Sequence, residues 1–156
     1  MTKSNSNESH ETVTEISHGG KLLALIVPDS FKKAGIHFFT PDEFSQQLAY
    51  MNHPAGKIIP PHVHNPVARE VQFTLEVLFI KRGRLRVDFY SAGREYLESR
   101  ILSAGDVILL ATGGHGFEAL DDLEMVEVKQ GPYAGEQDKT RFTGITREQV
   151  SYNRGS

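Results

Sequence analysis

Short apolar runs separated by turn residues fill the middle of the chain. From Gly56 onward these runs recur at intervals of roughly ten residues, with turn residues such as Gly83, Gly93 and Gly105 between them. This pattern is typical of an all-β sandwich or barrel, because each strand is short and the chain reverses at each turn. The sequence therefore predicts strands at 57–64, 75–82, 84–90, 95–102, 107–111, 116–120 and 125–130.

The segment 84–90 shows the alternation of a strand most clearly. Its apolar residues Leu85, Val87 and Phe89 alternate with Arg84, Arg86 and Asp88. Successive side chains of a strand point to opposite faces, so one face is expected to be buried and the other to meet solvent or an interface. We expect the arginines at 82, 84 and 86 to lie on a solvated strand face.

The first 55 residues predict less regular structure. Residues 1–20 are polar with few apolar anchors, which indicates a disordered tail. The apolar runs 21–27 and 36–39 predict two more strands. Thr40, Pro41 and Glu43 form the signature of a capped helix start, so a short helix is expected near 41–50.

Composition limits the class of protein. The 156 residues are enough for one stable domain, with the barrel at 21–133 and an irregular C-terminal arm at 134–156. The formal charge of -3 and the pI near 6.2 argue against a nucleic-acid partner. Neither a membrane span nor a signal peptide is predicted, so a cytoplasmic protein is expected. Cysteine is absent, and any metal must therefore be held by nitrogen and oxygen.

Four side chains could hold such a metal. His62 and His64 are two residues apart on an extended segment, so their rings can share a face. Glu76 on a following strand and His115 further along could converge on the same point. Three imidazoles and a carboxylate suit Fe(II), Mn(II), Zn(II), Ni(II) or Co(II) and leave coordination positions open. A lone histidine is more often structural, and we expect surface or tail positions for His10, His18, His37 and His53.

The same residues resemble the cupin family of small β-barrels. The first cupin motif is Gly-x5-His-x-His-x3-4-Glu-x6-Gly, and the chain matches it with Gly56, His62, His64, Glu76 and Gly83. The interval of 11 residues between His64 and Glu76 is longer than in the family, so 65–75 resembles an insertion. Glu70 is the alternative carboxylate, although Glu76 has the expected spacing to Gly83. The resemblance implies one cupin-type barrel, a double-stranded β-helix or jelly roll, preceded by one short helix.

The second cupin motif is looser. Gly105, Gly113 and His115 follow it, but Ala111 replaces the proline and no asparagine follows. The ending at 127–133, with Asp138 and Lys139, is similar to WbuC-type cupin-fold metalloproteins and related cupins of bacterial surface-polysaccharide gene clusters. This resemblance implies a sugar or sugar-nucleotide substrate and a homodimer formed through a sheet edge or an exchanged strand, for which 21–27 is a candidate.

Several functions stay open at this point. A Lewis-acid centre suits isomerisation or epimerisation of a sugar, whereas an iron centre suits a dioxygenase. Proton transfer requires an acid or base, for which Glu118 and Glu127 are candidates. Arg82 is a candidate substrate contact, because the period of two places it on the same side as Glu76. Two alternatives are a non-catalytic cupin that binds a sugar as a sensor or accessory subunit, and a metal-free barrel that uses histidine as a base.

Overall fold

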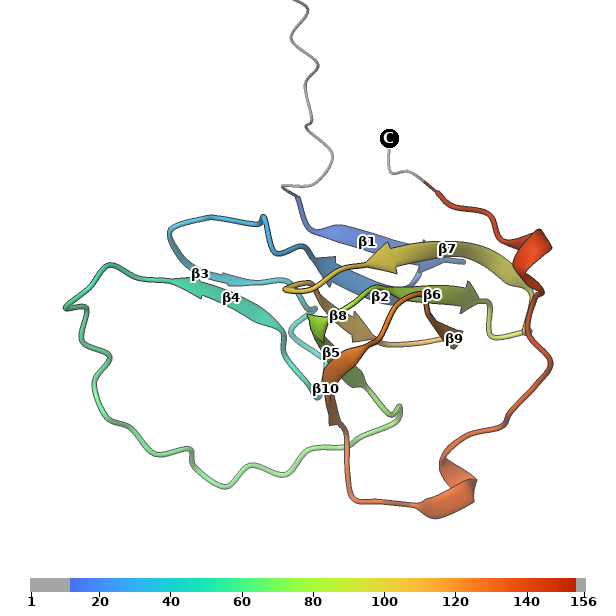
Figure 1. Ribbon diagram of the computed structural model, residues 1–156. Coiled ribbons are helices and arrows are strands. Elements are labelled where there is room, and N and C mark those ends of the chain that lie inside the picture. Colours follow the sequence, from blue (N-terminus) through green and yellow to red (C-terminus); the bar gives the residue numbers. More distant parts are fainter. Residues whose placement is uncertain (1–11, 154–156) are drawn as a thin grey trace, which may run out of the picture. The chain divides into compact units, whose positions relative to one another are not determined.

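The computed structural model describes residues 12–153, which form two compact units (Figure 1). The first unit combines residues 12–31 with 74–153, and the second unit is Lys32–Phe73. The sequence of the second unit is therefore inserted into that of the first. The part of the chain that the structure describes is all-β with antiparallel pairing and contains no α-helix.

Two antiparallel sheets build the first unit. The five-stranded sheet has the order β1-β2-β8-β5-β10, and the three-stranded sheet has the order β7-β6-β9. The strands are β1 (Thr14–His18), β2 (Lys21–Val27), β5 (Glu76–Arg82), β6 (Leu85–Tyr90), β7 (Tyr96–Leu102), β8 (Val107–Leu110), β9 (Gly114–Ala119) and β10 (Glu124–Lys129).

The core of this unit lies between apolar faces of its strands. Leu78 of β5 and Ile108 of β8 are paired neighbours and are both fully buried. From β6, the residues that the alternation assigns to the core, Leu85, Val87 and Phe89, join the same cluster. Burial of each such side chain contributes about 1.5–3 kcal/mol. The binary pattern thus predicted the buried face of β6 correctly.

Most predicted strands are confirmed. The prediction for 21–27 coincides with β2, and those for β5, β6, β7, β8, β9 and β10 agree to within two residues at each end. Between β5 and β6, Gly83 has a φ of 80°, and a Cβ there would clash with the backbone carbonyl of Asp122. The hairpin therefore needs glycine at this position.

Three expectations about the N-terminal half are wrong. Residues 14–18 form β1, which pairs with β2, although 1–20 was expected to be a tail; residues 1–11, with His10, lie outside the described part. β2 lies between β1 and β8 in the sheet, and its exchange between two copies stays a prediction. No strand forms at 57–64, where Pro60 and Pro61 cannot donate to a ladder.

The expected helix near 41–50 is the third error. Thr40 does not cap a helix: its hydroxyl accepts from the Leu48 backbone N–H and donates to Gln47 Oε1. Residues from Ala49 onward instead form a strand. In the second unit, β3 (Gly35–Phe38) pairs with β4 (Ala49–Asn52), and the long segment to residue 73 has no regular structure.

The C-terminal segment covers polar side chains of the three-stranded sheet. It contains the short 3-10 turns η2 (Gly135–Asp138) and η3 (Arg147–Gln149). Tyr90 Oη accepts a hydrogen bond from the Ile145 backbone at 3.0 Å, and Arg147 forms an ion pair with Glu118. The second face of β6 is thus interfacial.

This cover corrects the expectation of a solvated face for Arg86, whereas Arg82 is exposed as expected. Arg86 and Asp88 are buried and form a two-pronged ion pair at 2.8 and 3.0 Å, while Ser99 Oγ donates to Asp88. The pair raises the pKa of Arg86, first through the hydrogen bonds that Arg86 donates to Asp88. Arg84, in contrast, is exposed and forms its ion pair with Asp121. Separately, no helix within 12–153 is long and apolar enough to cross a membrane.

Candidate metal centre

Glu76 and His115 meet across the two sheets of the first unit. Glu76 opens β5 and faces inward, in register with Leu110 of β8 and Lys129 of β10. His115 is near the start of β9, opposite Phe89 of β6. The His115 Nε2 atom lies 3.2 Å from Glu76 Oε2, and the Glu76 side chain is only 12% exposed. Two of the four predicted ligands are therefore neighbours.

Lys129 joins this pair from the edge strand β10. Its Nζ lies 3.0 Å from Glu76 Oε1 and 3.1 Å from Asp138 Oδ2. Asp138 also accepts a hydrogen bond of 2.6 Å from Thr74 Oγ1. Sequence reasoning did not assign Lys129 a role. The sequence could have suggested a role, because Lys129 lies two residues after the candidate Glu127 and strand side chains two apart share a face.

The neighbours of Glu76 keep its carboxylate ionised. The hydrogen bond with His115 is the largest cause that lowers the pKa of Glu76 to about 2, and Lys129 acts in the same direction against the cost of burial. The Glu76 and Asp138 carboxylates raise the pKa of Lys129, so its ammonium group stays protonated. The site therefore holds an anionic oxygen donor beside an imidazole.

The spacing of the two donors fits a shared divalent ion. Oxygen and nitrogen ligands lie about 2.0–2.2 Å from such an ion, so two ligands at a right angle are about 3 Å apart. The Glu76 and His115 atoms are 3.2 Å apart, which also suits a direct hydrogen bond. If His115 Nε2 carried no hydrogen, its lone pair and the Glu76 carboxylate could both bind the same ion.

His62 and His64 lie in the second unit, on the segment without regular structure. Their ring centroids are 5.2 Å apart, and both residues are exposed. His62 Nδ1 lies 3.1 Å from the Pro60 carbonyl oxygen, which can only accept, so Nδ1 carries the hydrogen. In the neutral ring Nε2 then keeps its lone pair, as in many histidine ligands of metals. Glu70, the alternative carboxylate, lies exposed in the same unit.

The structure thus describes two pairs of the predicted ligands, one in each unit. Among residues 12–153, no group of three or more histidine, aspartate or glutamate side chains that could hold a metal ion is found. The role of His62, His64, Glu76 and His115 as one ligand set stays a prediction.

The other predicted site residues lie in different surroundings. Glu118 is three residues after His115 and therefore on the opposite face of β9, where Arg86 Nη1 lies 2.5 Å from its Oε2. Glu127 is exposed, on the same face of β10 as Lys129. Arg82 ends β5, about 20 Å along the strand from Glu76, and forms an exposed ion pair with Glu124.

These positions change the candidates for chemistry. The guanidinium groups of Arg86 and Arg147 both contact the Glu118 carboxylate, which makes it a poor acid or base for a reaction beside His115. A small substrate bound at Glu76 could not reach Arg82 at the far end of the strand. Glu127 is the one of the three that lies beside Lys129, two residues away on the same face of β10.

Comparison of the chain with protein-family models, with curated proteins and with solved structures finds no match.

Proposed function

We propose that the protein is a metal-binding cupin that acts on a small polar substrate. The contact of Glu76 with His115 across the two sheets carries this proposal, because it brings a carboxylate and an imidazole from distant parts of the sequence to a common point. His62 and His64 complete the proposed ligand set, and the ion would be Fe(II), Mn(II), Zn(II), Ni(II) or Co(II).

The side chains around Glu76 support specific roles. A bound divalent ion would supply Lewis-acid polarisation of a carbonyl or enediolate oxygen. Lys129 contacts Glu76 Oε1 and leaves Oε2 directed at His115, so it is a positioning residue for the carboxylate. Glu127 is the proposed acid or base, since it is exposed and shares the Lys129 face of β10.

The substrate class follows from the resemblance to WbuC-type cupins. We propose a sugar or sugar nucleotide of bacterial surface-polysaccharide synthesis, with isomerase- or epimerase-like chemistry, and a homodimeric protein. The edge strands β1 and β10 of the five-stranded sheet are the places where a second copy could add to that sheet. Sedimentation of a monomer at micromolar concentration would contradict the dimer.

Metal titration tests the central proposal. Chelator-treated protein is titrated with each of the five divalent ions, and binding is read by calorimetry and thermal unfolding. At an ion concentration of about 100 Kd the folded state gains about 2.7 kcal/mol, which raises Tm by roughly 5–10 °C for a chain of this size. His115→Ala, Glu76→Gln and His62→Ala should abolish the shift.

His37→Ala is the matched control, because its ring lies outside the ligand set and contacts the Ala34 carbonyl. It should keep the full shift in Tm. A protein that takes up none of the five ions, or takes them up equally well after loss of His115 and Glu76, would contradict the metal site.

A non-catalytic sugar-binding cupin is the second candidate. The ion pairs that hold Glu118 favour it, because they remove one of the two proposed acid–base groups. Turnover of nucleotide sugars with added metal that is lost in His62→Ala would identify an enzyme, whereas binding without turnover across a broad panel would identify a sensor. Consumption of dioxygen by the iron-loaded protein would identify the dioxygenase.

A further inference from the structure

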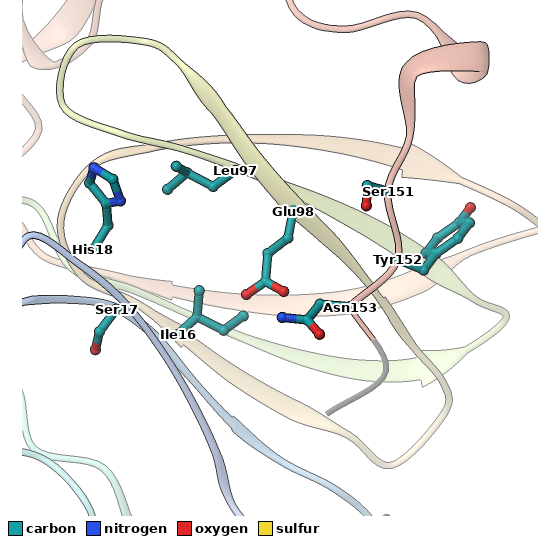
Figure 2. A pocket seen from close by; sticks show the side chains of 8 residues that line it. All are labelled: Ile16, Ser17, His18, Leu97, Glu98, Ser151, Tyr152 and Asn153. Atoms are coloured by element: carbon teal, nitrogen blue, oxygen red, sulfur yellow. The ribbon is translucent and has the colours of Figure 1, made fainter. Parts of the chain in front are cut away.

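A cavity of about 310 Å³ lies in the first unit, away from the candidate metal centre (Figure 2). Its volume is at the lower end of the range for small-molecule sites, about 300–1,000 Å³. Residues of β1, β7 and the C-terminal segment line it: Ile16, Ser17, His18, Leu97, Glu98, Ser151, Tyr152 and Asn153. It therefore lies where the edge strand of one sheet approaches the edge strand of the other.

The wall formed by the C-terminal segment is fixed to β7. Ser99 N donates to the Ser151 carbonyl at 2.9 Å, and Ser151 N donates to Tyr96 Oη at 2.8 Å. Ser99 and Tyr152 form a parallel β-bridge. Because backbone hydrogen bonds hold this wall, a ligand would enter a largely preformed site and would pay little ordering entropy.

Glu98 contributes a carboxylate to the lining of this cavity. Figure 2 shows its carboxylate among the lining side chains, between Ile16 and Asn153. Glu98 Oε2 is buried and lies 3.3 Å from Arg100 Nη2, but within the described residues it makes no hydrogen bond of good geometry. The buried Nε of Arg100 is likewise without one. Because these two atoms are closed to solvent, a ligand would meet Glu98 through the part of its carboxylate that lines the cavity.

The charges favour an uncharged partner. The guanidinium of Arg100 offsets the Glu98 carboxylate, so a cation that approached Glu98 would also meet a positive charge. A hydroxyl group can donate to the part of the Glu98 carboxylate that lines the cavity without this repulsion. Ser17, Asn153 and Tyr152 supply further polar groups, while Ile16 and Leu97 supply apolar contacts for carbon-bound hydrogens. This combination suits a molecule with several hydroxyl groups on a carbon ring.

We propose that the cavity between β1 and β7 binds a neutral polyhydroxylated ring of monosaccharide size, with Glu98 as its main hydrogen-bond acceptor. This site is independent of the proposed function. Glu98 and His115 pair with Phe89 from opposite sides of β6, so about two strand spacings, roughly 10 Å, separate them.

Backbone amide NMR of the intact chain tests the proposal. D-glucose, D-galactose, N-acetyl-D-glucosamine and myo-inositol are titrated separately at millimolar concentrations. At least one of them should shift the amides of His18, Leu97 and Tyr152 in a saturable way. Glu98→Gln should weaken this binding about tenfold or more, because a hydrogen bond to a charged acceptor is replaced by one to a neutral amide.

Tyr152→Ala provides a second variant in case Glu98→Gln does not fold, since Tyr152 is 48% exposed and its β-bridge uses only the backbone. It should also weaken the binding. Glu15→Gln on the exposed face of β1 and His115→Ala should leave it unchanged. The proposal is overturned if none of the four compounds shifts these amides, if putrescine alone does so, or if both cavity variants bind as the wild type does.

Discussion

Glu76 Oε2 and His115 Nε2 lie 3.2 Å apart although their strands belong to different sheets. The contact depends on two separate features, the inward register of Glu76 beside Leu110 and the position of His115 opposite Phe89. A slip of one residue in either ladder would turn one of the side chains away from the other. The centre is therefore a sensitive reporter of correct pairing in both sheets.

Lys129→Met should strengthen binding of divalent metal. The ammonium of Lys129 contacts Glu76, so it repels a cation that approaches the same carboxylate. We expect the Kd for the ion to fall at least about tenfold, since this repulsion amounts to more than 1.4 kcal/mol at an effective dielectric constant of about 20. Calorimetric titration measures it, with Lys81→Met on the exposed side of β5 as the control. Weaker binding by Lys129→Met would contradict the prediction.

Asp88→Asn should destabilise the protein strongly. Asp88 is buried against Arg86 and also accepts from Ser99, so its neutralisation leaves a buried guanidinium with one carboxylate partner fewer. The expected loss is about 3 kcal/mol in the free energy of unfolding, measured by urea denaturation. Asp121→Asn removes a comparable pair with Arg84 on the surface and should cause only a small change. Equal effects of the two variants would contradict the difference in burial.

Asp138 should stabilise the protein in a pH-dependent way. The hydrogen bond from Thr74, followed by that from Lys129, lowers the pKa of Asp138 below its ordinary value of 3.8. A lowered folded-state pKa gives stability that is fully present above 3.8 and is lost as the pH falls through the lowered value. Wild type and Asp138→Asn should therefore differ in unfolding midpoint at pH near 7 and converge under strongly acidic conditions. A difference that grows on acidification would contradict this sign.

Gly113→Ala should disturb the start of β9, which carries His115. Gly113 has a φ of 75°, and a Cβ there would lie 2.6 Å from the Tyr90 carbonyl oxygen and closer still to Leu23. The expected cost is about 1–3 kcal/mol, from the left-handed backbone and the clash together. Gly20→Ala has a similar φ of 73° but nothing within 4 Å, so it isolates the backbone contribution. Thermal unfolding should rank Gly113→Ala below Gly20→Ala.

The strands were predictable where alternation and burial agree. In β6 the pattern identified Leu85, Val87 and Phe89 as core residues, since period two is a local property of the sequence. It could not identify what covers Arg86 and Asp88, because their cover comes from a segment more than 50 residues later in the chain. The general alternative of an interfacial face was correct, and the specific expectation of solvated arginines was confirmed for Arg82 and Arg84 but wrong for Arg86.

The helix prediction failed because a capping signature fixes only where a helix could start. Instead of capping a helix, the Thr40 hydroxyl accepts a hydrogen bond from the Leu48 backbone and donates one to Gln47. Residues 49–52 then pair with β3, and ten residues with one modest apolar face offer little to oppose that pairing. A capping motif of four residues does not include Gln47 and Leu48, so it could not predict these hydrogen bonds.

The candidate site was predictable in part, because Glu76 and His115 stand at motif positions. The Lys129 contact was not, since it depends on the antiparallel register between β5 and β10. The sequence also indicated that Glu98 and Arg100 point inward. They alternate along β7 in step with the buried Leu102, so the three side chains lie on the same face of the strand.

Tyr90 and Tyr96 accept hydrogen bonds from the backbone of the C-terminal segment, so the cavity exists only while that segment is intact. A protease that cut beyond Gly144 would detach one wall, open the space around Glu98 to bulk water and uncover the charges on β6. Cleavage at this position would therefore abolish binding in the proposed cavity, while Glu76 on β5 and His115 on β9 would stay in place.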